Sequence, residues 1–145
     1  MKTSKQGIDL IKKYEGCRLK AYLCPSGIPT IGYGNTYYYS GAKVKIGDTI
    51  TQDEAELLLD RLVPKYENTV KRSIVAPLNQ NQFDALVSFC WNCGSSRTLF
   101  RLINEKSNDS IIYNWWTAHY VTGNGVKLPG LVKRRLEEAD LFIKK

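Results

Sequence analysis

Apolar residues recur at three- and four-residue steps over much of this chain, which is the spacing of helices that bury one face. The first such stripe consists of Ile8, Ile11 and Tyr14. It predicts a short helix over residues 4–15. Glu15 stands at the carboxyl end of that helix, so the first predicted element presents a carboxylate where the chain changes direction.

The next stretch changes to the alternation that strands require. Leu19, Ala21 and Leu23 alternate with charged or aromatic neighbours and predict a strand. Pro25-Ser-Gly27 supplies a turn, and Thr30-Ile-Gly-Tyr-Gly34 forms the returning strand. The glycines of that return allow a backbone or a ligand to approach closely. We therefore expect this β-ribbon to form the floor of a cleft.

After the ribbon the pattern returns to helices. Residues 37–50 are polar and turn-rich and predict one more short strand with loops. A capping box, Thr51-Gln-Asp-Glu54, then begins a long helix, in which Pro64 is expected to cause a kink or a break. Asn79 caps a further helix. The remaining helices are expected over residues 97–105, 110–120 and 131–143, with Gly123-Asn-Gly125 as a turn and Pro129 at the start of the last helix.

These elements predict a single α+β domain over residues 1–145, divided into two lobes with a cleft between them. A small β-ribbon lobe covers about residues 16–50, and a linking helix covers about 52–72. A larger, all-helical lobe covers about residues 78–143 and includes the N-terminal helix. One domain agrees with a length of 145 residues, which allows about two-thirds of the unfolded surface to be buried.

Charge and hydropathy limit the possible partners. Lys and Arg number 21 against 14 Asp and Glu, a net charge of +7 that attracts polyanions over roughly 8–10 Å at physiological salt. Nucleic acid, anionic lipid and phosphate-bearing cell wall are all polyanions that this charge would attract. Only Lys133-Arg-Arg135 forms a tight basic cluster, so the distribution of the charge does not select one of these partners. The longest apolar runs are far shorter than the ~20 residues of a membrane span, so we expect no stable membrane insertion.

The start of the chain has no long apolar core and no small-residue cleavage site, which predicts a protein held in a cytoplasm. Reducing conditions there favour free thiols. Cys90-x-x-Cys93 has redox spacing, but it falls late in a predicted helix, whereas a redox thiol is usually activated at a helix start. A zinc site that also uses Cys17 and Cys24 is disfavoured by the six-residue gap in that pair. We expect no metal and no cofactor.

Glu15, Cys24 and Thr30 bring candidate acid–base groups into one short stretch. Cleavage of a glycosidic bond needs a group that is still protonated near neutral pH. It also needs a group on the other face of the sugar that handles water or the developing positive charge. A lone glutamate at a helix end is more often a solvated residue than a catalyst, so this spacing needs independent support.

Five short motifs, distributed in order between residues 12 and 142, provide that support. They are Lys12-Lys-Tyr-Glu15-Gly-x-Arg18-Leu-x-Ala21-Tyr22, Thr30-Ile-Gly-Tyr-Gly34, Leu78-x-Gln80-Asn-Gln-Phe-Asp-Ala-Leu-Val-Ser88, Asn92-x-Gly94 and Gly130-Leu-x-x-Arg134-Arg135-x-x-Glu138. Together they resemble the motifs of the phage-type lysozymes, glycoside hydrolase family 24. The resemblance implies a lysozyme-like two-lobed fold. It also implies cleavage of peptidoglycan at the β-1,4 bond between N-acetylmuramic acid and N-acetylglucosamine.

The same resemblance implies roles for the three residues. Glu15 would be the proton donor, Cys24 would replace the usual Asp, and Thr30 would help to position the attacking water. An unperturbed thiol has a pKa of about 8.5, so only a few per cent is thiolate near pH 7. Cys24 can therefore match an Asp only if its surroundings lower its pKa. Asn35, where many relatives have His, is a second departure from the family pattern.

Four further residues are expected to bind substrate. Trp91 and Asn92 belong to a stretch that resembles the aromatic-Asn-x-Gly element of the family, and Tyr33 lies within the ribbon motif. Arg134 is preferred over its neighbour Arg135 as a residue that faces the cleft and pairs with Glu15. The aromatic run Tyr37-Tyr-Tyr39 is a further candidate for the wall-binding face, and its alternative is an ordinary half-exposed strand or loop.

The resemblance implies an endolysin, a monomeric muramidase held in the host bacterial cytoplasm until a separate holin-type protein releases it to the wall. Its partner would be bacterial peptidoglycan. A lytic transglycosylase is a chemical rival, because it needs a single acid. A non-catalytic basic wall-binding module is a rival of another class, and a nucleic-acid binder is the weakest, since no recognised motif accompanies the charge.

Overall fold

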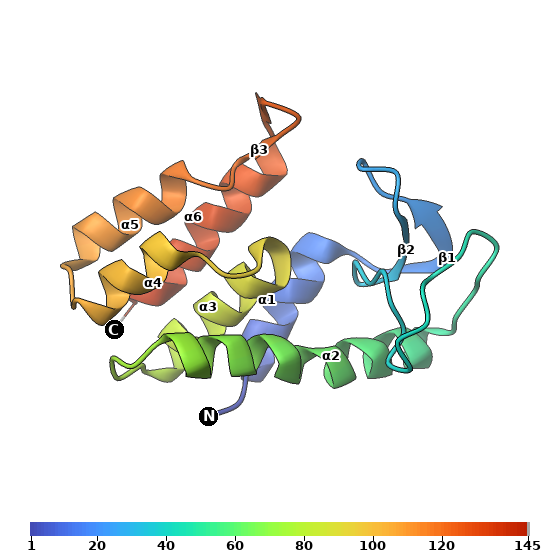
Figure 1. Cartoon of the computed structure of the whole chain (residues 1–145), viewed down its shortest axis with the longest axis horizontal. Helices are drawn as coiled ribbons and strands as arrows, with labels where there is room; N and C mark the ends of the chain where they lie inside the picture. Colours follow the sequence, from blue (N-terminus) through green and yellow to red (C-terminus); the bar gives the residue numbers. More distant parts are fainter. Residues whose placement is uncertain (145) are drawn as a thin grey trace. The chain divides into compact units, whose positions relative to one another are not determined.

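The computed structural model of the chain describes residues 1–144 and contains helices with two small antiparallel sheets (Figure 1). The elements are α1 (Lys5–Glu15), β1 (Arg18–Leu23), β2 (Pro29–Gly32), α2 (Gln52–Ser73), α3 (Gln80–Cys93), α4 (Arg97–Asn104), α5 (Asp109–Ala118), β3 (Thr122–Gly123), β4 (Val126–Lys127) and α6 (Pro129–Ile143). This composition confirms the predicted α+β class. Within residues 1–144 no helix has the length and apolar character that crossing a membrane requires.

Contacts divide the chain into two compact units, which are described separately below. The ribbon unit consists of Ile11–Pro64. The helical unit consists of Met1–Leu10 together with the chain from Lys65 onward. Both α1 and α2 contribute residues to each unit, because the divisions fall inside these two helices.

In the ribbon unit β1 pairs with β2 in antiparallel register, with Tyr22 opposite Thr30 and a bulge between Arg18 and Tyr22. One face of the ribbon buries Ala21 and Ile31 in a small core. The other core residues are Val44 and Leu58, with Tyr38, Ile50 and Leu62 packed against them. The strand expected within residues 37–50 does not form; this stretch makes only isolated bridges, because left-handed turns at Gly41 and Gly47 interrupt any ladder.

The first turn of α2 is closed by the predicted capping box. The Thr51 amide donates to Glu54 Oε1, and the Glu54 amide donates to Thr51 Oγ1, each at 3.1 Å. The break expected at Pro64 is absent, since α2 runs unbroken over 22 residues. Buried apolar residues on both sides of the proline, Val63 and Val70, anchor the two halves and offset the one lost amide donor.

In the helical unit α3 packs against α6, and α5 packs against both α4 and α6. Asn79 forms a capping box with Gln82 at the start of α3, as predicted, and Pro129 lies in the first turn of α6. Every residue of α3 from Phe83 to Cys90 is buried. Figure 1 shows α5 and α6 side by side.

The expectation that this half is all helix is wrong. Strands β3 and β4 form a two-stranded hairpin between α5 and α6. Its turn is the predicted Gly123-Asn-Gly125 loop, in which Asn124 and Gly125 have φ values of 52° and 78°. Positive φ at both central positions is the geometry of a tight hairpin turn, and it directs the flanking residues into strands rather than helix.

Two buried carboxylates of the helical unit hold the start of α1. The Thr3 amide donates to Glu67 Oε2 at 2.6 Å, and the Ser4 amide donates to Asp84 Oδ1 at 3.0 Å. The hydroxyl of Ser4 also binds Asp84, which is fully buried. Gly7 lies against Thr3 and Asp84 so closely that a side chain there would collide with both. The first turn of α1 is thereby fixed to α2 and α3.

Candidate active site

Glu15 is the last residue of α1 and is partly buried. The helix ends there because Gly16 adopts a left-handed conformation, with φ of 65°, and its amide donates to Lys12 O at 2.9 Å. A glycine at this position is a common helix terminator, because it has no Cβ to oppose positive φ. The side chain of Glu15 thus extends from the end of a helix where the chain turns into β1.

Gly34 brings the backbone after β2 into direct contact with the Glu15 carboxyl group. A Cβ added to Gly34 would overlap the Glu15 side chain, and its φ of 82° also disfavours other residues. The sequence-based expectation that a glycine of this motif permits close approach is therefore confirmed at Gly34. This contact joins two of the motifs, which are separated by almost twenty positions in the sequence.

Asn35 locks the turn that carries Gly34. Its backbone exchanges two hydrogen bonds with Ile31, each 2.9 Å long, and its side-chain Oδ1 accepts from the Tyr33 amide at 3.2 Å. Asn35 is 5% exposed. The residue that departs from the family pattern therefore supplies a hydrogen bond that holds the turn, without an ionisable group.

Cys24 lies in the turn that joins β1 to β2. The Cys24 carbonyl accepts from the Gly27 amide at 2.8 Å, and the Cys24 amide donates to Ile28 O at 3.0 Å. The thiol is partly buried and lies 3.6 Å from the Ser26 hydroxyl. Hydrogen bonding from Ser26, and then from the backbone of Ile28, lowers the pKa of Cys24 to about 7. About half of the thiol is therefore thiolate at pH 7.

Thr30 is buried in β2, and its hydroxyl donates to Ile28 O at 2.9 Å. Because that hydrogen is engaged, the oxygen presents its lone pairs as acceptors. Thr30 is therefore an acceptor beside the turn that carries Cys24, whereas the thiolate of Cys24 is favoured chiefly by Ser26 and the backbone of Ile28.

Tyr22 lies within electrostatic range of Glu15 and Cys24, and sequence reasoning did not identify it as a site residue. Burial is the main reason that its pKa is raised; Arg18 opposes the shift, and the charges of Glu15 and Cys24 add to it. The Arg18 guanidinium lies 4.6 Å from the centre of its ring. The signal that could have identified Tyr22 as a site residue was its position in the ribbon, where it pairs with Thr30 on the opposite strand.

Tyr33, a predicted substrate-binding residue, has its phenol engaged within the ribbon unit. Its hydroxyl donates to Glu56 Oε1 at 3.2 Å and accepts from Gln52 Nε2 at 3.1 Å. Glu56 in turn pairs with Lys12 at 2.6 Å, which raises the pKa of Lys12 and lowers that of Glu56. The side chain is 6% exposed and ties the ribbon to both helices, so contact of Tyr33 with substrate stays a prediction.

Trp91 and Asn92 lie at the end of α3 in the helical unit. The Trp91 ring is partly buried and lies 5.0 Å from the Tyr66 ring, and both border a hollow of about 330 Å³. Asn92 is exposed, and its Oδ1 accepts from the Cys93 thiol at 3.6 Å. A half-open aromatic face beside a side-chain amide can bind a sugar ring, so both residues remain predicted binding residues.

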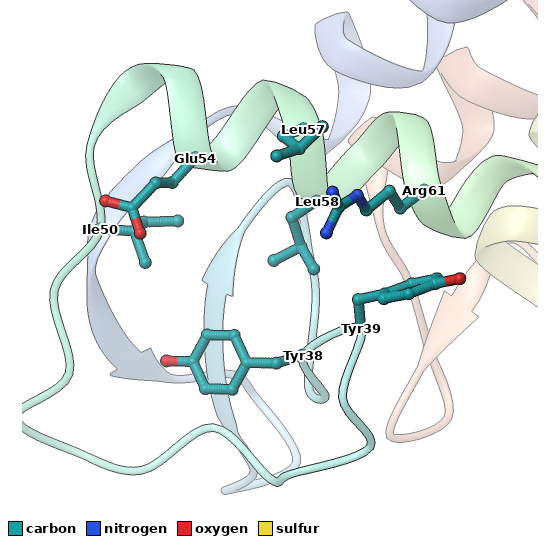
Figure 2. A pocket seen from close by; sticks show the side chains of 7 residues that line it. All are labelled: Tyr38, Tyr39, Ile50, Glu54, Leu57, Leu58 and Arg61. Carbon is teal, nitrogen blue, oxygen red and sulfur yellow. The ribbon is translucent and has the colours of Figure 1, made fainter.

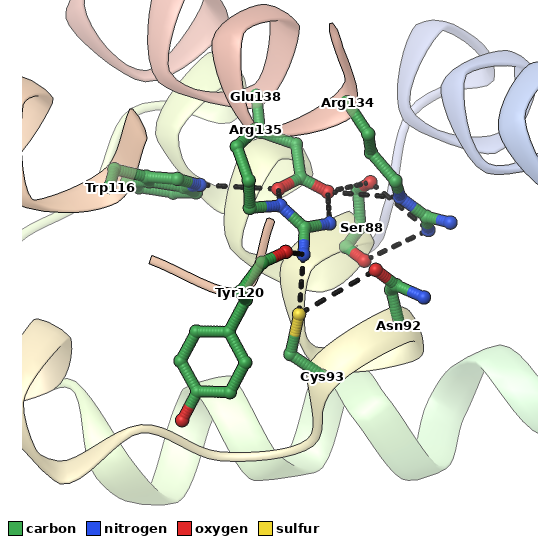
Figure 3. A network of polar contacts seen from close by, with 8 residues as sticks. All are labelled: Ser88, Asn92, Cys93, Trp116, Tyr120, Arg134, Arg135 and Glu138. Carbon is green, nitrogen blue, oxygen red and sulfur yellow. Dashed lines mark hydrogen bonds and ion pairs between the residues drawn. The ribbon is translucent and has the colours of Figure 1, made fainter. Parts of the chain in front are cut away.

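Arg134 is only 2% exposed and belongs to a buried network around Glu138 (Figure 3). Glu138 accepts two hydrogen bonds from Arg135, at 2.8 and 3.0 Å, and one from Arg134 Nε at 3.2 Å. Trp116 Nε1 and Ser88 Oγ donate to the same carboxylate at 3.1 and 2.6 Å. Arg134 also donates to Ser88 O at 3.1 Å. The network gives both arginines a structural role, and the predicted pairing of Arg134 with Glu15 stays a prediction.

The thiols beside this network differ from Cys24. Burial raises the pKa of Cys90 to about 12 and that of Cys93 to about 11, although Arg135, whose Nη1 contacts the Cys93 sulfur, opposes the second shift. Both cysteines are free. A thiol with a raised pKa is a poor nucleophile, which argues against a redox role for the Cys-x-x-Cys stretch.

Comparison with known proteins agrees with the geometry. Residues 12–138 match the family described as phage lysozyme. The chain is 40% identical to the endolysin of Acyrthosiphon pisum secondary endosymbiont phage 1, over 98% of each sequence.

Solved structures give the same result. The endolysin from Escherichia coli O157:H7 phage FAHEc1 superimposes with a TM-score of 0.84 at 38% identity, over 99% of this chain and 94% of that one. The muramidase domain of SpmX from Asticaccaulis excentricus superimposes with a TM-score of 0.83 at 33% identity, over 99% of each chain. These similarities confirm the predicted lysozyme-like fold, and the chain belongs to the phage lysozyme family.

Proposed function

We propose that the chain is an endolysin, a muramidase that hydrolyses the β-1,4 bond between N-acetylmuramic acid and N-acetylglucosamine in peptidoglycan. The observation that carries this proposal is the family match along residues 12–138, which contains Glu15, Cys24 and Thr30 in one compact unit. The lowered pKa of Cys24 adds a second group able to act near neutral pH.

In the proposed reaction Glu15 donates its proton to the glycosidic oxygen as the bond to the anomeric carbon breaks. Thr30 accepts a hydrogen bond from a water molecule, because its own hydrogen is engaged by Ile28 O. The Cys24 thiolate removes a proton from that water as its oxygen bonds to the anomeric carbon. Solvent then reprotonates Glu15 and takes the proton from Cys24. Direct attack by water inverts the configuration at the anomeric carbon.

Muropeptide analysis of wall digests tests this proposal. Wild type is expected to leave reducing ends, and Glu15→Gln is expected to leave none above background. A lytic transglycosylase would instead leave 1,6-anhydro ends, because it closes a hydroxyl of the sugar onto the anomeric carbon. Sedimentation of the protein with walls, without any released fragments, would indicate a binding module and contradict the proposal.

We also propose that the protein acts as a monomer and is held in the host cytoplasm until a holin-type protein gives it access to the wall. What supports this order of events is that a wall-degrading enzyme made inside the cell needs a route across the membrane. Expression in the host is expected to cause lysis only when a membrane-permeabilising protein is co-expressed. Light scattering of the purified protein is expected to give a mass of about 16.5 kDa. Lysis without the second protein would contradict the dependence.

A further inference from the structure

A preformed hollow of about 160 Å³ lies on the ribbon unit, and neither Glu15, Cys24 nor Thr30 lines it (Figure 2). It is lined by side chains from the loop after β2 and from the first half of α2: Tyr38, Tyr39, Ile50, Glu54, Leu57, Leu58 and Arg61. Its volume is comparable to a single large amino-acid side chain. The hollow therefore suits one residue of a peptide better than a whole disaccharide.

The α2 side of the hollow is an ordered stripe with opposite charges at its ends. Glu54, Leu58 and Arg61 follow one another at steps of four and three residues, so they share one face of the helix. Glu54 and Arg61 are seven residues apart, which is roughly 10 Å along the axis. Figure 2 shows the carboxylate and the guanidinium at opposite ends, with the apolar side chains between them.

Arg61 is oriented by Tyr39. Its guanidinium lies 5.2 Å from the centre of the Tyr39 ring, and that ring is 65% exposed. Among residues 1–144 Arg61 has no hydrogen bond or ion pair, so its donors face solvent. A guanidinium fixed against an aromatic face is well suited to bind a carboxylate with two parallel hydrogen bonds.

Glu54 is fixed at the other end by the capping box. Its Oε1 accepts from the Thr51 amide at 3.1 Å, which uses one of about four acceptor positions of a carboxylate. The remaining positions can accept from an ammonium group. Glu54 therefore offers a charged acceptor whose location is set by the start of α2.

The floor of the hollow is rigid. Leu58 belongs to the small core of the ribbon unit, and Ile50 packs against it. The Tyr38 hydroxyl donates to Asp48 Oδ2 at 2.7 Å, and this bond together with burial raises the pKa of Tyr38 to about 12. Tyr38 thus lines the hollow as a neutral side chain that is already held in place, so a ligand need not order this part of the site on binding.

We propose that the hollow binds the stem peptide of peptidoglycan, with the side chain of one residue in the hollow, Arg61 on a free carboxylate and Glu54 on a free amino group farther along the same peptide. This inference rests on the proposed function, because it assumes that the wall is the substrate. A neutral N-acetyl sugar would leave both charges without partners, and a polyanion would be repelled by Glu54. Opposite charges at the ends of an apolar hollow match the zwitterionic peptide part of the wall.

Two substrates separate this proposal from the proposed function. Peptide-bearing wall fragments and glycan chains stripped of peptide by an amidase both contain the bond that is cleaved. The lactyl carboxylates that the amidase exposes are converted to neutral amides, so that the stripped glycan offers Arg61 no carboxylate. Arg61→Ala is expected to raise the half-saturating concentration of the peptide-bearing fragments about tenfold, with the maximal rate unchanged. Its rate on stripped glycan is expected to equal that of wild type.

Arg72→Ala is the matched control, because it removes one positive charge from an exposed position in the last turn of the same helix. It is expected to leave both substrates unaffected. An equal effect of Arg61→Ala on both substrates, or an equal effect of the two arginine variants, would overturn the peptide site. Failure of wild type to cleave either substrate would instead overturn the proposed function.

A binding experiment tests each charge directly in the Glu15→Gln protein, which cannot degrade its ligand. The probe is a soluble stem peptide with free amino and carboxyl groups, titrated by NMR. Acetylating the amino group of the peptide is expected to weaken binding to the same extent as Glu54→Gln. The acetylated peptide should bind the Glu54→Gln protein no more weakly than either change alone would predict, because both changes remove the same interaction. Gln retains the capping box. Additive losses, or binding of stripped glycan in place of peptide, would refute the assignment.

Discussion

The two polar clusters of this protein are built in opposite ways. In the ribbon unit Glu15 and Cys24 are partly buried and are held by turns, close backbone approach and hydroxyl groups. In the helical unit Glu138, Arg134 and Arg135 are almost completely buried, and each is held by charged hydrogen bonds. The first cluster keeps its groups accessible to water, whereas in the second both carboxylate oxygens of Glu138 accept hydrogen bonds from neighbouring side chains.

The thiols show what this difference does to chemistry. Hydrogen-bond donors around Cys24 favour the thiolate of Cys24. Burial disfavours the thiolate of Cys93, although Arg135 contacts the Cys93 sulfur. Charge next to a thiol is therefore not sufficient for reactivity when the thiol is desolvated. The buried ion network therefore holds the helices together, whereas the solvated turn keeps Cys24 available for the proposed reaction.

The largest expected effect is the loss of activity in Glu15→Gln. Wall lysis should fall by roughly a thousandfold, since general acid catalysis typically contributes 10²–10⁴. Stability should change by less than about 0.5 kcal/mol, because Gln has the same shape as Glu and the position is only partly buried. Turbidity loss of permeabilised bacteria and thermal unfolding measure the two quantities. Asp9→Asn, an exposed carboxylate of the same helix, should retain activity. Full activity in Glu15→Gln would contradict its role as acid.

Glu138→Ala should have the reverse profile. Removing the carboxylate leaves two buried guanidinium groups without it, which typically costs about 3–5 kcal/mol of unfolding free energy. Urea unfolding measures this change, and Asp140→Ala on the exposed side of α6 is the control, with an expected cost below about 1 kcal/mol. A loss of activity without any loss of stability would place Glu138 in the reaction and remove the contrast between the clusters.

Gly34→Ala should lower activity by roughly 10- to 100-fold, because the new methyl group displaces the Glu15 carboxyl and small misplacements of catalytic groups cost up to about that much. Gly41→Ala controls for backbone strain, since Gly41 also has positive φ but an added Cβ there meets no other atom within 4 Å. It should destabilise the protein slightly and keep its activity. Equal activity losses in the two variants would mean that strain, rather than contact with Glu15, is responsible.

The smallest expected effect is on the pH profile. In the proposed reaction Cys24 works as the thiolate, which is present above its lowered pKa and lost below it, so the wild-type rate should fall about tenfold per unit as pH drops below about 7. Cys24→Asp should extend activity by at least two units toward acid, and Cys24→Ala should lower the rate at all pH values. The fall in rate on the acid side of the pH profile, its acid limb, is measured by steady-state lysis between pH 5 and 9.

Ser26→Ala tests the cause of that limb. Loss of the main hydrogen bond to Cys24 should move the limb toward alkaline pH by less than about one unit and slow alkylation of Cys24 at pH 7. Cys93 should be alkylated more slowly than Cys24 in both proteins. An acid limb that is identical in wild type, Ser26→Ala and Cys24→Asp would show that Cys24 does not titrate in the reaction.

Local signals made the helices predictable from the sequence. The capping box at Thr51, the cap at Asn79 and the proline at position 129 all act within a few residues, and the structure has helices where they indicate. Of the kink or break predicted at Pro64, the break does not occur, because buried residues pack on both sides of the proline. The strand predicted within residues 37–50 was wrong, because positive φ at glycines overrode local propensity.

The sequence by itself determined the family, the order of the helices and the spacing of Glu15, Cys24 and Thr30, since short motifs and their periodicity specify each of them. Only the tertiary structure decided which thiol is activated, that Gly34 touches Glu15 and that Arg134 is buried beside Glu138. The reason is physical: a pKa and a burial depend on which distant atoms surround a group, and no local pattern records those neighbours.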